Sequence, residues 1–388
     1  MDLLSRSVTN SGRFAVTSEA DDDPGTPAPV YVDAQGVCLD DGRTMTLTRH
    51  GLMDRKHPVT QVDFSWCQLN DSAFLRIASC LGHCEELIRF VADWTCLTDI
   101  SADRIRFVVA KQSSHLRHFS LLHGTTFTCD GLCKILQGLA QCCKLAVLRI
   151  SAGTHNCTQS CTGGAEALFL ALSTALWKNR RTLRDVTLTG IDTRRFAKPF
   201  LSCLTHSCVS RLAKLRFVGL NLDSAQYMGL LQSAIKHCSG TLTQFRVEND
   251  KLGLSFVENI IEPLAECSTL HTVGFVNIGI PSSALPILGR IAAKKRQTAT
   301  GFTLDILGND FSEELDERVC AEVSIAFRSL FILFIDVDKV HPNIMGALRW
   351  TMKTRYRIRS EPAGSLPEIP PTTFPSRPLF EHWLHLQE

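Results

Sequence analysis

The residues best suited to chemistry are three potential metal ligands, His155, Cys157 and Cys161, which lie close together in the sequence. Zinc sites favour Cys and His ligands at short spacing, but a structural site needs four ligands and this segment lacks a C-x-x-C pair. We therefore interpret the segment as a loop that carries thiols. We predict no metal site and no cofactor.

Other motifs for catalysis or cofactor binding are missing from the sequence. It has no G-x-x-x-x-G-K-[ST] phosphate loop, no G-x-G-x-x-G turn, no G-x-S-x-G elbow and no H-E-x-x-H pair. Neighbouring carboxylates such as Glu85 and Glu86 fall in expected turns, where they form no acid–base pair. We predict no catalytic residues and no enzyme activity.

The composition is that of a folded protein without a membrane span. Of 388 residues, 44% are apolar and 21% are charged, and the formal net charge of +2 argues against a protein that coats nucleic acid. No run of about 18 apolar residues predicts a transmembrane helix. The 16 cysteines are too sparse for a disulfide scaffold, and residues 1–20 lack the apolar stretch of a secretory signal. We expect a cytoplasmic protein, with cytoskeletal association and mitochondrial import as weaker alternatives.

An internal repeat runs through most of the chain and must position any functional residue. Its frame is L-x-x-L-x-L-x-x-x-x-L, and successive frames begin 28, 29, 29, 38, 29, 30, 28 and 31 residues apart. The first, fourth and sixth positions of nine frames are apolar in 26 of 27 cases, against about 12 expected from composition. The frames begin at Val59, Leu87, Leu116, Leu145, Leu183, Leu212, Leu242, Leu270 and Gly301.

Each frame predicts a strand followed by a helix. The L-x-L spacing is typical of a strand with one buried face, and apolar residues at spacings of three and four follow it. Examples of these helical stripes are Phe74, Ile77, Ala78 and Leu81; Leu132, Ile135, Leu136 and Leu139; and Tyr227, Leu230, Leu231 and Ala234. One such unit cannot bury its apolar faces alone, so stacked units must share a continuous core. We expect Pro199, Pro263 and Pro286 to shorten or kink their helices.

This pattern resembles the leucine-rich repeat family, and specifically its ribonuclease-inhibitor-like subfamily with units of 28–29 residues. The resemblance implies an α/β solenoid shaped like a horseshoe, with a parallel β-sheet on the concave face and helices on the convex face. The family's Asn/Cys position holds Cys67 and Asn309 but is otherwise mostly replaced, so we expect only part of its hydrogen-bonded ladder.

Cysteine-containing leucine-rich repeats are a second, less close resemblance. Cys84, Cys142 and Cys267 come three residues before a frame, and Cys208 and Cys238 come four residues before one. However, the period is longer than in that subfamily and no F-box-like segment precedes the repeats. We expect these cysteines to fill the helix-to-strand turn as small apolar side chains.

The repeat pattern divides the chain into five segments. We predict a disordered N-terminal tail over residues 1–29, and an N-terminal cap or degenerate repeat over 30–58. About nine repeats follow over 59–311, with an insertion near 153–163. A C-terminal cap over 312–360, with a helix and a last strand, precedes a proline-rich tail over 361–388.

The third, fifth and seventh positions of each frame are expected to line the concave face, because alternate strand residues point to opposite sides. The basic residues among them are Arg89, His118, Arg149, Lys214, Arg216 and Arg246. Guanidinium groups make forked contacts to carboxylates and phosphates. We predict that these residues bind an acidic or phosphorylated segment of a protein partner.

The family resemblance implies an intracellular, eukaryotic and non-enzymatic scaffold or assembly subunit for protein–protein interaction. An alternative is a regulator of another enzyme, of the inhibitor or GTPase-activating type found in this subfamily. A further alternative is a subunit of a large ribonucleoprotein. The basic segment Lys353 to Arg359 supports this alternative. The near-neutral net charge of the chain argues against binding of nucleic acid outside such an assembly.

Overall fold

The structure is a computed structural model. It describes residues 15–18, 30–33, 59–67, 69–84, 86–123, 126–151, 164–190, 202, 205, 211–219, 225–295 and 301–351. The predicted insertion near 153–163, most of the segment 30–58, and the tail beyond residue 351 lie outside these ranges.

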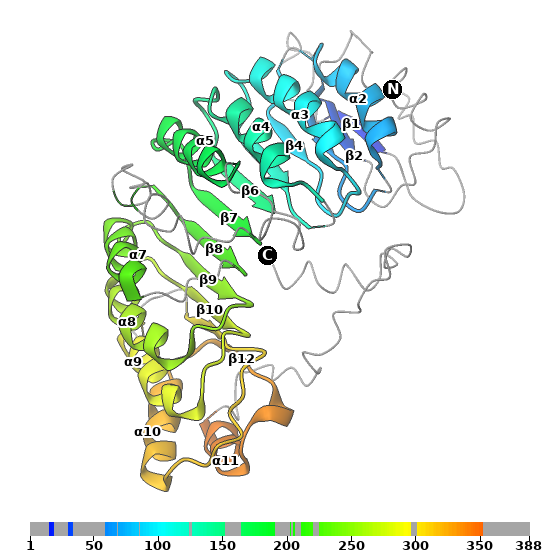
Figure 1. The fold of residues 1–388 in the computed structure, drawn as a ribbon. Coiled ribbons are helices and arrows are strands. Elements are labelled where there is room, and N and C mark those ends of the chain that lie inside the picture. Colours follow the sequence, from blue (N-terminus) through cyan, green and yellow to red (C-terminus); the bar gives the residue numbers. More distant parts are fainter. Residues whose placement is uncertain are drawn as a thin grey trace, which may run out of the picture.

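One sheet runs through the described chain, with its strands in sequence order (Figure 1). The first pair is antiparallel and every later pair is parallel. The strands are β1 (Ala15–Ser18), β2 (Val30–Asp33), β3 (Val59–Asp63), β4 (Arg89–Val91), β5 (His118–Leu121), β6 (Val147–Ser151), β7 (Asp185–Thr189), β8 (Lys214–Val218), β9 (Gln244–Glu248), β10 (Thr272–Val276), β11 (Thr303–Asp305) and β12 (Ile332–Phe334).

Helices follow the strands and lie along the outer side of the arc that the sheet forms (Figure 1). They are α2 (Asp71–Leu81), α3 (Asp99–Lys111), α4 (Cys129–Leu139), α5 (Gly164–Lys178), α7 (Ala225–His237), α8 (Gly253–Glu266), α9 (Leu285–Lys295), α10 (Glu317–Phe327) and α11 (Pro342–Thr351). The fold class predicted from the sequence is therefore confirmed: the chain forms an α/β leucine-rich repeat solenoid.

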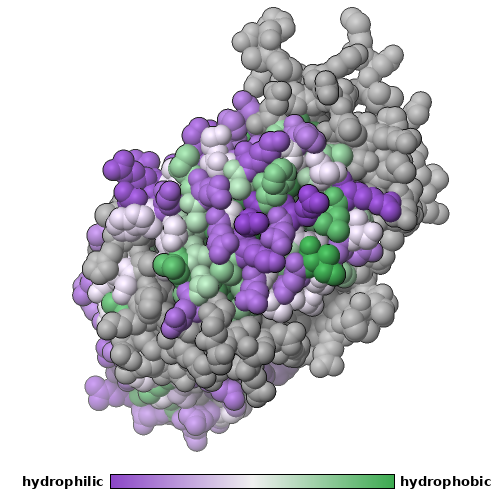
Figure 2. Space-filling model, turned by 45° about the horizontal axis from the view of Figure 1, so that its top comes forward, coloured by the Kyte–Doolittle hydropathy of each residue, from purple (hydrophilic) through white to green (hydrophobic). Residues whose placement is uncertain are grey.

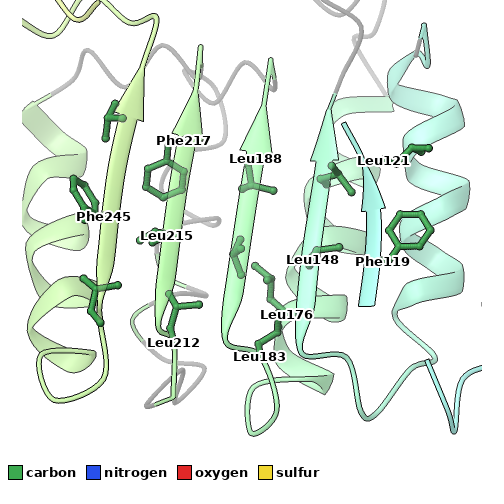
Figure 3. Close-up of a cluster of buried hydrophobic side chains, with 14 of the residues drawn as sticks. Phe119, Leu121, Leu148, Leu176, Leu183, Leu188, Leu212, Leu215, Phe217 and Phe245 are labelled. Carbon is green, nitrogen blue, oxygen red and sulfur yellow. The ribbon is translucent and has the colours of Figure 1, made fainter. Parts of the chain in front are cut away.

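The core lies between the sheet and the helices, where the frame places it. All 26 apolar residues at the first, fourth and sixth frame positions are at most 2% exposed. Figure 3 shows how those of neighbouring strands, such as Leu148, Leu188 and Phe217, form rows on one side of the sheet. The core is therefore continuous from repeat to repeat, as a solenoid requires.

The predicted helical stripes are buried in α2 and α4, but the stripe of α7 is rotated. In α7 the buried side chains include Met228, Leu231 and Ala234, whereas Leu230 is only partly buried. The prolines also disturb the helices less than predicted. Pro286 lies in the first turn of α9, where it is tolerated, and α8 continues through Pro263 for three more residues. Pro199 lies outside the described residues.

The sheet continues beyond the nine predicted frames at both ends, and at the C-terminal end it does so with the strand predicted within the cap. β1 lies within the tail expected to be disordered and pairs with β2, so that expectation does not hold for Ala15–Ser18. At the other end, Leu330, Leu333 and Ile335 repeat the frame and are buried beside β12. Gly301 leaves the first position of its frame without a side chain, and the neighbouring Phe302 fills the core instead.

The periodic cysteines fill the turns before the strands, as expected. Cys142, Cys238 and Cys267 are buried, and Cys84 is partly buried. Burial raises the pKa of the Cys142 thiol to about 12, which makes it a poor nucleophile. Cys208 lies outside the described residues.

Candidate partner-binding face

The six predicted partner-binding residues all lie on strands of the concave side, but most of them are already engaged within the chain. In the register of the sheet, Arg149, Thr187, Arg216 and Arg246 are direct neighbours on β6 to β9. Adjacent strands lie about 4.8 Å apart. The side chains of these four residues therefore form one row across the sheet, and acidic side chains lie on either side of this row.

In the N-terminal strands, Arg89 lies between an acid and an imidazole. Its Nη2 donates to Asp63 at 3.4 Å and its Nη1 donates to a ring nitrogen of His118 at 3.0 Å. Burial, together with the charges of Arg89 and Arg149, lowers the pKa of His118 to about 3. His118 is therefore a neutral hydrogen-bond acceptor near pH 7 and does not contribute a positive charge.

Asp93 adds an acidic group to the same strands. Its carboxylate accepts hydrogen bonds from the Leu122 amide at 2.7 Å and from the Ser120 hydroxyl at 2.8 Å. Burial raises the pKa of Asp93 to about 6, although both hydrogen bonds act in the opposite direction. The sequence predicted Asp93 on the concave face but gave no sign of this perturbed pKa.

Arg216 and Arg246 form a closed network with two carboxylates. Arg216 donates to both oxygens of Glu248, from Nε at 2.6 Å and from Nη2 at 3.1 Å. Arg246 also donates to Glu248, and its Nη1 donates to Asp305 at 2.6 Å. The charges of Arg216 and Arg246 outweigh the effect of burial, so the pKa of Glu248 lies below its ordinary value.

The network depends on a glycine in the middle of a strand. Arg246 on β9 reaches Asp305 on β11 by crossing β10 at Gly274. A Cβ atom at Gly274 would lie 2.7 Å from Cγ of Arg246, a separation that real Cβ atoms do not show. Because Gly274 has no side chain, it leaves room for the Arg246 side chain to cross β10.

Arg149 and Lys214 are engaged less completely. Arg149 donates only Nη2 to Asp185, at 2.6 Å, while its buried Nε has no hydrogen-bond partner. Its side chain is 34% exposed, compared with 20% for Arg216. Lys214 is exposed, and no carboxylate in the described part of the chain lies within ion-pairing distance of it.

The charges on the concave positions of the nine frames cancel overall but are unevenly distributed. Five basic side chains face five acidic ones, when His118 is counted as neutral. The strands β6 to β9 carry four basic and two acidic residues, a sum of +2, whereas β3 to β5 and β10 to β11 each sum to −1. The face is therefore positive at its centre and negative at both ends.

An aromatic rim borders this face at the end of the N-terminal strands, and the sequence analysis missed it. The rings of Trp66 and Trp94 stack with centroids 4.4 Å apart, and the ring of His123 lies 4.7 Å from that of Trp94. All three have positive φ, at the eighth frame position, where the repeats from β7 to β11 have Gly or Asn. The signal in the sequence was the shared frame position of these aromatic residues.

Hydrophobic side chains are scattered over the surface. Hydrophilic side chains dominate the described part of the face shown in Figure 2, and hydrophobic ones form small separate patches. The large hydrophobic side chains that are exposed among the described residues are Ile100, Phe107, Leu170, Trp177, Ile325 and Phe331. Such scattered residues are normal on a protein surface and do not mark a site by themselves.

The structure describes no further site for chemistry. His155, Cys157 and Cys161 lie outside the described residues, and within those residues no group of three His, Cys, Asp or Glu side chains is arranged to hold a metal ion. None of the described helices is long and apolar enough to cross a membrane.

Comparison with known proteins gives likenesses among solved structures only. No protein-family model matches the chain, and no curated protein matches it. Among solved structures, an internalin from Listeria monocytogenes is similar, with a TM-score of 0.35 and 14% identity over 76% of this chain and 84% of the internalin. The fold assignment rests on the repeats and the sheet of this chain itself.

Proposed function

We propose that this protein is a non-enzymatic scaffold or assembly subunit that binds a protein partner on the concave face of its sheet. The observation that carries the proposal is the uneven charge of that face, which is positive over β6 to β9 and negative on both sides. Such an alternation selects a partner with the complementary order of charges. The repeat period and the helices that follow most of the described strands favour the ribonuclease-inhibitor-like subfamily.

The same charge distribution narrows the choice of partner. A concave face without excess positive charge offers little non-specific attraction to a nucleic-acid backbone, whose binding depends on many uncompensated cations. A folded or extended protein segment with an acidic centre fits better. We therefore favour a protein partner over the ribonucleoprotein alternative.

A pair of surface variants tests this proposal. Gln244→Tyr places a ring on the concave face, at a partly buried position of β9, and Ser233→Tyr places the same ring on exposed α7. Proximity labelling in cells, with each variant at equal abundance, should show at least tenfold loss of specific neighbours for Gln244→Tyr only. Equal labelling by both variants and the wild type would rule out the concave face.

A further inference from the structure

The concave face holds two kinds of basic side chain, distinguished by how completely the chain uses their hydrogen bonds. Arg216 is held by a forked contact to both oxygens of Glu248, and Arg246 is held between Glu248 and Asp305. Releasing either arginine would leave a nearly buried carboxylate without its cation, which is costly. These two side chains therefore serve the fold.

Arg149 and Lys214 retain hydrogen-bond donors that the described part of the chain does not use. Arg149 makes a single contact to Asp185, and Lys214 makes no ion pair with a described carboxylate. On the strands β6 to β9, the buried polar side-chain atoms without a hydrogen-bond partner are Nε of Arg149 and Oγ1 of Thr189. Thr189 is only 6% exposed and belongs to β7, the strand between those that carry Arg149 and Lys214.

The central strands thus combine a positive charge with incomplete hydrogen bonding. Buried polar groups in folded proteins are almost always hydrogen-bonded, so two unpartnered ones on adjacent strands need an explanation. For Arg149 an incoming oxyanion supplies it, since it can accept from Nε and an Nη in a forked contact while Lys214 adds its charge.

We infer that β6 to β8 form an oxyanion subsite, in which Arg149 and Lys214 bind a carboxylate or phosphate side chain of the protein partner. This inference rests on the proposed function and makes it more specific. It narrows the predicted set of six residues to two, because Arg89, Arg216 and Arg246 are engaged within the chain and His118 is neutral. On binding, Arg149 keeps its contact from Nη2 to Asp185, whose side chain is only 10% exposed, and adds the forked contact through Nε and its remaining Nη hydrogens.

Two labelled peptides test the subsite with the full chain: one with three consecutive glutamates and one with a single phosphoserine, both otherwise Gly and Ser. Fluorescence polarisation at low salt should detect binding of at least one, which shows whether carboxylate or phosphate is preferred. The double variant Arg149→Gln and Lys214→Gln should weaken that binding at least tenfold. The effect should shrink as salt rises, because salt screens exposed charges.

The control removes the same charge from the convex side. Lys178→Gln with Lys236→Gln changes two exposed residues at the ends of α5 and α7, and it should change the affinity less than twofold. Equal weakening by both double variants, or no binding of either peptide at millimolar concentration, would overturn the subsite. If the peptides fail but Gln244→Tyr still removes cellular neighbours, the concave face remains the binding surface and only the oxyanion subsite is wrong.

Discussion

The N-terminal and C-terminal parts of the solenoid join neighbouring repeats with different polar groups. Near the N-terminus, Asp71 at the start of α2 accepts hydrogen bonds from the Thr98 amide and hydroxyl, and Asp99 accepts the same pair from Thr128. Near the C-terminus, the side chain of the buried Asn309 is hydrogen-bonded to five backbone groups of its own and the preceding repeat. The same backbone repeat thus tolerates different connections at its two ends.

The charged side chains of the concave face differ in the same way. In β3 and β4, the pair of Arg89 and Asp63 is extended by a neutral His118. In β8 to β11, two arginines share two carboxylates across Gly274. We conclude that the apolar frame fixes the fold, while the concave positions are available for local networks.

The largest effect is expected for Asn309→Ala. The substitution leaves the amides of Ile278 and Ile280 and the carbonyl of Phe275 without their partner inside the protein. Urea unfolding should show a loss of about 3 kcal/mol in the free energy of unfolding. Asn259→Ala on exposed α8 serves as the control and should cost less than about 0.5 kcal/mol. Similar losses for both would show that the C-terminal connection is not special.

Gly274→Val is expected to cost about 2 kcal/mol, because its side chain displaces Arg246 from the path to Asp305. Urea unfolding measures this loss. In the control Gly229→Ala, the new Cβ meets nothing within 4 Å in the middle of α7, so the variant should be as stable as wild type or more stable. A stable Gly274→Val would mean that the crossing arginine contributes nothing.

His118 should make the N-terminal part sensitive to acid by about 1 kcal/mol, a value reduced for its partial exposure. Its pKa is about 3 in the folded chain, below the ordinary 6.5, so the unfolded chain binds the proton first as pH falls. Stability from this group is complete above pH 6.5 and decreases below it. The melting temperature of His118→Gln should therefore fall less between pH 7.5 and 5 than that of wild type, whereas exposed His237→Gln should match wild type. Identical slopes for all three proteins would contradict this prediction.

The smallest effect is expected for Trp94→Gly in the aromatic rim. Replacing Trp94 by glycine removes the conformational cost of positive φ, roughly 1 kcal/mol. It also removes the stacking with Trp66 and His123, which stabilises the fold by a similar free energy. The free energy of unfolding should stay within about 1 kcal/mol of the wild-type value. A loss above 2 kcal/mol would show that ring stacking dominates the rim.

The sequence predicted the parts of the structure that repeat. Apolar residues such as Leu148 and Phe217 recur at fixed positions of the repeat frame. Apolar residues that recur in this way indicate a shared core. The pairing of Arg246 with Asp305 could not be predicted, because the two side chains meet across an intervening strand and the contact depends on Gly274. The low pKa of His118 also depends on burial, which a strand position alone does not give.

The most direct test of the account compares two double-mutant cycles by urea unfolding. Arg246, paired with Asp305, is an arginine that the fold requires, whereas Arg149, paired with Asp185, can bind a partner. With Arg→Gln and Asp→Asn changes, we predict a coupling energy of about 2 kcal/mol for the first pair and below about 1 kcal/mol for the second. An equal or larger coupling for Arg149 and Asp185 would contradict the account.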